Sequence, residues 1–196
     1  MNKTALYFLV FLSAILTGCA TPHKQLTRDE WMQATTRTYA GVNKDQVLSA
    51  TEKLLRLADG DDFNIIHTES GINATRNWIA YMVIAGVSGT DYWDIRATPI
   101  ERGVNVSVQV STQSQNTAPM QMGSNWMPVN STNPGTPAYG VAIYDIFFSR
   151  LDYMLGKRAN WMTCKEADER VKNGSTWGNN EALCNSFNMT DSLPNQ

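Results

Sequence analysis

The sequence predicts an α+β fold in which an antiparallel sheet of four to five strands carries two main helices packed on one face. Four valines within residues 104–110 alternate with polar residues, a pattern typical of a strand with one face in the core and one in water. Apolar residues recur at helical spacing over Lys44–Ala58 and again over Tyr139–Lys157. Strand patterns lie between these two segments, so we expect both helices to cover one sheet.

The first elements are indicated by capping signals. Thr27 and Glu30 have the spacing of a capping box, in which each side chain satisfies a free amide of the other residue at a helix start. A short first strand is expected over Thr36–Gly41. Asn43 with Gln46 three residues later predicts the start of the first long helix.

Two hairpins are expected to supply the rest of the sheet. Phe63–His67 pairs with a strand through Ile72 and Arg76, and Tyr92–Pro99 pairs with Gly103–Ser111. The acidic turn at residues 59–62 lacks the spacing of a calcium loop, so no metal site is predicted there. After the second long helix, residues 161–187 are expected to form an irregular cap.

For two segments the sequence is compatible with more than one structure or role. Residues 78–87 are apolar on both faces, which fits a buried strand extension or short helix, or an exposed lobe that meets a partner or dips into a membrane. Residues 112–137 are rich in Gln, Asn, Ser and Thr, and we expect a long flexible loop, either a disordered insertion or a partner-binding loop. The candidate contact residues in these segments are Trp78, Tyr81, Met120, Met122, Trp126 and Met127.

The N-terminus carries the most specific motif. Lys3 precedes an apolar stretch over Ala5–Leu16 that is shorter than the ~20 residues of a spanning helix. Leu16-Thr17-Gly18-Cys19 then resembles the lipobox of Gram-negative bacterial lipoproteins. The resemblance implies that residues 1–18 are a signal peptide and that Cys19 receives a diacylglycerol. The alternative is an ordinary secretory signal with an incidental cysteine, which would leave the protein free.

The same resemblance suggests a location. Lipoproteins of this kind that stay in the inner membrane keep an Asp after the cysteine, whereas Ala20 follows here, which implies the outer membrane. With its full set of acyl chains, such an anchor is effectively permanent. We expect residues 19–26 to be a lipidated tether and residues 27–196 a single domain facing the periplasm.

Cys164 and Cys184 remain as a pair once Cys19 is assigned to lipid. In an oxidising periplasm a disulfide is the natural state for such a pair. A zinc site would need further ligands, and a catalytic thiol would need a histidine partner, whereas His23 and His67 lie far from both cysteines in sequence.

Composition and motifs exclude several function classes. Without residues 1–18 the chain has 15 basic and 18 acidic residues, a formal charge of −3, which argues against nucleic-acid binding. The sequence contains no nucleophile elbow, phosphate loop or metalloprotease helix, and His67 fits a strand residue better than a general base. We therefore expect no enzyme activity and no cofactor.

The leading hypothesis is a non-enzymatic lipoprotein that binds an envelope protein or assists envelope assembly, anchored to the membrane by its N-terminal lipid. The first alternative is a carrier of a lipid or another apolar ligand held between the sheet and the helices, which an enclosed apolar cavity would favour. A minor alternative is an envelope hydrolase with a carboxylate pair drawn from Asp61, Asp62, Glu69 and Asp91.

Overall fold

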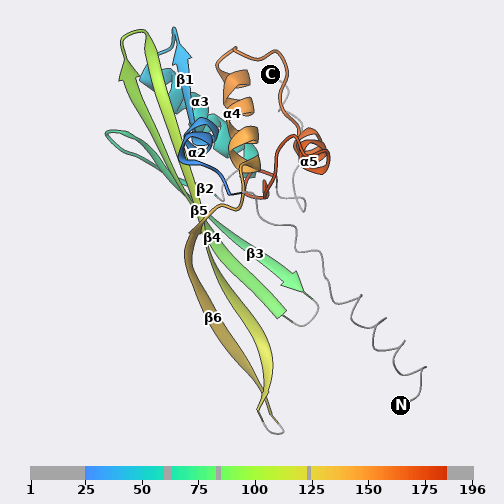
Figure 1. Ribbon diagram of the computed structural model, residues 1–196. Coiled ribbons are helices and arrows are strands. Elements are labelled where there is room, and N and C mark those ends of the chain that lie inside the picture. The colour runs from blue at the N-terminus through green and yellow to red at the C-terminus, as the bar shows by residue number, and fades with distance from the viewer. Residues whose placement is uncertain (1–24, 60–62, 83–84, 123–124, 185–196) are drawn as a thin grey trace, which may run out of the picture.

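The computed structural model describes residues 25–59, 63–82, 85–122 and 125–184 (Figure 1). Its class is α+β, as predicted, with an antiparallel sheet and helices on one face. The elements are, in order, α2 (Arg28–Thr35), β1 (Thr36–Ala40), α3 (Lys44–Asp59), β2 (Phe63–His67), β3 (Gly71–Met82), β4 (Ala85–Ile100), β5 (Gly103–Met122), β6 (Asn125–Pro137), α4 (Ala142–Met154) and α5 (Cys164–Lys172). The lipobox and residues 19–24 of the tether lie outside the described residues.

The sheet has six strands in the order β1-β5-β4-β3-β2, and β6 pairs with β5. β5 is long enough to pair with two strands along the edge that faces away from β4. Its first residues pair with β1 through Thr36↔Ser107 to Ala40↔Gly103, and its later residues pair with β6 from Ser111↔Pro137 onward. β1 and β6 therefore lie one after the other along the same edge of β5.

The core forms where the helices cover this sheet. The four valines of β5 are buried as predicted, and they meet Trp93 and Ile95 of β4 and Ile72 of β3 on the same face. From the helical side come Leu54 and Leu55 of α3 and an aromatic group on α4 that includes Phe147. In Figure 1, α2, α3 and α4 all lie over one half of the sheet, which we call the body.

The predicted capping signals are confirmed. Thr27 accepts a hydrogen bond from the Glu30 amide while the Glu30 carboxylate accepts one from the Thr27 amide. Asn43 and Gln46 exchange the equivalent pair at the start of α3. α4 begins later than predicted because Gly140, at φ 82°, is pressed against Gly178 and leaves no room for a side chain.

The predicted loop at residues 112–137 is wrong. Apart from residues 123–124, which lie outside the described residues, this segment forms the second half of β5 and all of β6. The composition concealed the strands because the helices do not extend over this half of the sheet (Figure 1), so neither face needs an apolar pattern.

Residues 78–82 and 85–87 also belong to strands, while 83–84 lie outside the described residues. β3 continues to Met82 and pairs with β4 down to Met82↔Ala85. Trp78 is half-buried, but Ile79 is 63% exposed. The strand extension is therefore present, but at Ile79 it is exposed and not buried as the first alternative expected. Together, the ends of β3 and β4, the end of β5 and all of β6 form a four-stranded part of the sheet that projects beyond the body. We call it the extension.

Candidate functional site: a polar row and cavity at the root of the extension

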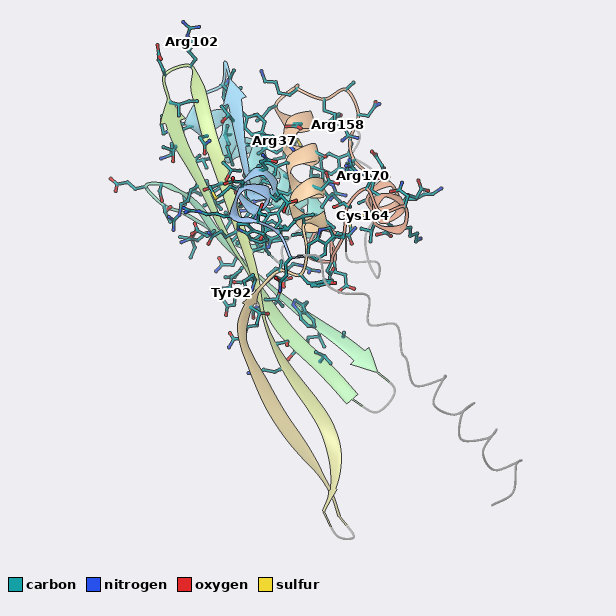
Figure 2. The ribbon with its side chains drawn as sticks, viewed as in Figure 1. Arg37, Tyr92, Arg102, Arg158, Cys164 and Arg170 are labelled. Carbon is teal, nitrogen blue, oxygen red and sulfur yellow. A yellow bond between two sulfur atoms is a disulfide. The ribbon has the colours of Figure 1, made fainter. Side chains whose placement is uncertain are left out.

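A row of polar residues crosses the sheet where the body gives way to the extension. Arg76 of β3 is paired with Asp91 of β4, and Asp91 is paired with Thr112 of β5. All three lie on the face that carries the core, each two residues away from a buried core residue of its own strand, namely Ala74, Trp93 and Val110. Tyr92, labelled in Figure 2, marks this level on the opposite face of the sheet. The Arg76–Asp91 ion pair thus lies at the boundary of the apolar core.

Asp91 is the centre of this row. Its carboxylate accepts hydrogen bonds from the Thr112 hydroxyl at 2.7 Å, the Trp78 indole N–H at 3.3 Å and the Arg76 guanidinium at 3.4 Å. Arg76 and Asp91 are only 3% and 4% exposed. Burial raises the pKa of Asp91, and it outweighs the opposing effects of the Thr112 hydrogen bond and the Arg76 charge.

The indole of Trp78 is held by its neighbours on the sheet. It lies over Gly89, its register partner on β4, where an added Cβ would be 2.4 Å from the indole atom Cζ2 and 2.6 Å from the Gln113 carbonyl oxygen. The glycine therefore makes room for the ring. The indole N–H donates to Asp91 and the ring packs against Gly89, so both contacts place the indole beside the polar row.

A cavity of about 370 Å³ opens over this row. The sheet supplies its floor through Arg76, Asp91, Trp78 and Thr112. The opposite wall comes from chain segments around α4 and the C-terminal cap, with Tyr139, Ile143, Asn179, Glu181 and Ala182. The volume is within the usual range for small-molecule sites, and the lining combines aromatic and aliphatic surface with a few polar groups.

The C-terminal cap that forms this wall is fastened to α4. Cys164 and Cys184 form the predicted disulfide, with a Cα–Cα distance of 5.5 Å. Arg150 of α4 is 1% exposed and donates to the carbonyl oxygens of Met162 and Leu183 at 3.0 and 3.1 Å. The cap was expected to be irregular, but α5 lies within it, and Thr163 caps that helix by accepting from the Glu166 amide.

The predicted contact residues fall into one region. Trp78 and Tyr81 lie on β3, Met120 and Met122 on β5, and Trp126 and Met127 on β6. Met120 is the register partner of Met127, so the two segments proposed separately from the sequence are parts of one four-stranded extension. Among these six residues, Trp78 has a side chain that the structure describes, and this side chain borders the cavity.

Two of the four acids named for a hydrolase, Glu69 and Asp91, lie among the described residues. Asp61 and Asp62 lie outside the described residues, and Glu69 is an exposed residue of the turn before β3. Asp91 shares the cavity with Glu181, which the sequence analysis did not single out. Arg76 was missed as well. The sequence held one signal for this residue: Arg76 is charged, but it falls at a position of the strand pattern that faces the core.

Comparisons with protein families, curated proteins and solved structures find no match to this chain. Within the described ranges, no helix has the length and apolar character needed to cross a membrane. Nor does that part of the chain bring three or more His, Cys, Asp or Glu side chains together in a group able to hold a metal ion.

Proposed function

We propose that this protein is a lipoprotein of the Gram-negative outer membrane, anchored through Cys19 and facing the periplasm, that acts as a non-enzymatic binding or assembly module for envelope components. The lipobox supports the anchor. The observation that carries the binding role is the extension, because it continues the sheet beyond the helices that complete the core.

The extension is hard to explain as a means of stabilising the body. Ordering a strand residue costs roughly 1–2 kcal/mol of backbone entropy, and burial of apolar area is what normally offsets this cost. The helix-covered core ends at the polar row, and beyond it Ile79 and Ala80 of β3 are exposed. Strands with open edges and exposed apolar side chains are surfaces that other chains recognise.

The test is crosslinked co-purification from outer membranes with a shortened β5–β6 hairpin. Ala118 and Val129 are register partners next to the Pro119↔Pro128 pair, so they form a hydrogen-bonded pair. Residues 119–128 can therefore be replaced by a two-residue Asn-Gly turn without changing the register of the remaining strands. The body, the polar row and the Cys164–Cys184 disulfide are retained. The matched control is the intact chain, expressed at the same level.

Recovery of a specific envelope protein with the intact chain and its loss with the shortened hairpin would support the binding role. Equal recovery from both chains would place the interface elsewhere and contradict the role given to the hairpin. Incorporation of radioactive palmitate, abolished by Cys19→Ser, tests the anchor independently of any partner.

The cavity favours a second candidate, a carrier of a lipid or another apolar ligand. Ile143, Val110 and Trp78 give it apolar walls, while Arg76 and Asp91 give it a charged end that suits an amphipathic molecule. Native mass spectrometry of the purified lipoprotein would reveal a co-purified ligand that Ile143→Trp displaces. Because Asp91 and Glu181 both border the cavity, incubation with glycan strands would test the hydrolase alternative on the same sample.

A further inference from the structure

The extension contains an even number of strands, and this has a geometric consequence. Its order is β6-β5-β4-β3 and every neighbouring pair is antiparallel, so its two outer strands, β3 and β6, run in opposite directions. Two copies standing side by side in the same orientation would bring β3 of one beside β6 of the other. These strands would then continue the antiparallel pattern without interruption.

The outer edge of β3 has no strand partner along part of its length. β2 pairs with β3 only as far as Phe63↔Arg76, and among the described residues no strand pairs with the outer side of Asn77–Met82. This free stretch is level with the middle of β6 through the register Ala80↔Val87, Val87↔Asn116 and Asn116↔Ser131. The two edges are therefore at the same height in the extension.

The outer edge of β6 presents backbone groups at defined residues. Pro119 and Pro128 are register partners, and because neither has an N–H they form a non-hydrogen-bonded pair. Hydrogen-bonded and non-hydrogen-bonded pairs alternate along antiparallel strands. The N–H and C=O groups of Asn130 and Thr132 accordingly point away from β5, toward the outer edge of β6, where no other strand of the described residues pairs.

The free stretch of β3 and residues 129–133 of β6 lack the charged residues and prolines that normally prevent strands from adding on. Proteins protect open edges with charged residues, above all lysine. The sequence has no charged residue from Asn77 to Met82, and none from Gly103 to Tyr144, a span that contains all of β5 and β6. Pro128 and Pro134 flank the residues 129–133 and leave this central stretch of β6 free of proline.

We propose that copies of this protein associate edge to edge, with residues 78–82 of β3 in one copy pairing with residues 129–133 of β6 in the next. The interface joins two different edges, so association leaves one β3 and one β6 free at the ends and continues until the copies close into a ring. The inference names a partner for the proposed assembly role. It rests on that proposal for the shared orientation, because anchoring by Cys19 would align all copies on one membrane.

A disulfide trap tests this pairing in the full-length lipoprotein. Ala80→Cys and Ser131→Cys are combined in one chain. Within a single copy these positions are separated by three strand spacings, about 14 Å, whereas a disulfide requires Cα atoms within about 7 Å. A bond between them can therefore form only between copies. Outer membranes are oxidised mildly and analysed on non-reducing gels.

We expect the double variant to shift from monomer to a ladder of dimer, trimer and higher species that returns to monomer on reduction. Each single variant should remain monomeric. The matched control combines Ala80→Cys with Lys165→Cys, an exposed site on α5, and should show no ladder beyond random collision.

Absence of the ladder would overturn the proposal if both new cysteines react with maleimide while Cys164 and Cys184 remain protected. Dimers from Ser131→Cys alone would also overturn it, because they require β6 to pair with its own counterpart. Either result leaves palmitate incorporation and partner recovery unaffected, so failure of this inference is distinguishable from failure of the proposed function.

Discussion

Replacing Asp91 by alanine should destabilise the protein strongly. The substitution removes one carboxylate that receives three hydrogen bonds, and it deprives the buried Arg76 guanidinium of the charge 3.4 Å away. Removing one member of a buried ion pair typically costs about 3–5 kcal/mol because the remaining charge stays in a poorly solvated site. Urea unfolding of the purified protein, followed by far-UV circular dichroism, measures this change as a lower midpoint with an unchanged slope.

A compensating variant separates the buried charge from the loss of packing. Arg76→Met combined with Asp91→Leu removes both charges while keeping side chains of similar size, and paired replacements of this kind are commonly neutral or stabilising by about 1–4 kcal/mol. We expect the double variant to regain wild-type stability. If Asp91→Ala alone lies within about 0.5 kcal/mol of the wild type, the polar row does not hold the root of the extension and the reasoning is refuted.

Three further predictions follow from the same geometry. Removing the disulfide by Cys164→Ala and Cys184→Ala should lower the free energy of unfolding by about 3 kcal/mol, the chain-entropy value for a sequence separation of 20 residues, and an unchanged urea midpoint would contradict this. Gly89→Ala should displace the Trp78 indole and cost about 1–3 kcal/mol, visible as a change in tryptophan fluorescence and a lower midpoint. Burial raises the pKa of Asp91, so the protonated carboxyl adds stability that is complete below its ordinary pKa of about 3.9 and is lost as pH rises through the raised value. The stability of the wild type relative to Asp91→Asn should therefore fall as the pH rises above about 4, and a constant difference would show that Asp91 has no raised pKa.

The body of the fold was predictable because its local signals agree with its burial. The valine alternation in β5, the apolar spacing of α3 and the capping residues Asn43 and Gln46 each act within a few neighbouring residues. Such patterns indicate which face of a helix or strand packs against the core. The disulfide followed from the number of cysteines and the expected compartment.

The extension was not predictable by the same means. Its strands are held by backbone pairing over residues such as Gln115 and Asn116, and a sheet region without a helical cover leaves no apolar alternation in the sequence. α5 was missed although Thr163 and Glu166 have the spacing of a capping pair. The site at Asp91 required knowledge of the strand register, because Arg76 and Thr112 reach it from two different strands.

The most direct test of the binding role compares two exposed isoleucines on the same face of the sheet. Ile79 of the extension is 63% exposed, and Ile66 of β2, at the register position of Asn73 in the body, is 56% exposed. A photo-crosslinking amino acid is placed at one position or the other in the full-length protein in living cells. Discrete protein adducts from position 79 and none from position 66 are the predicted result. Adducts of equal yield at both positions, or from position 66 alone, would contradict the claim that the extension is the surface through which this protein acts.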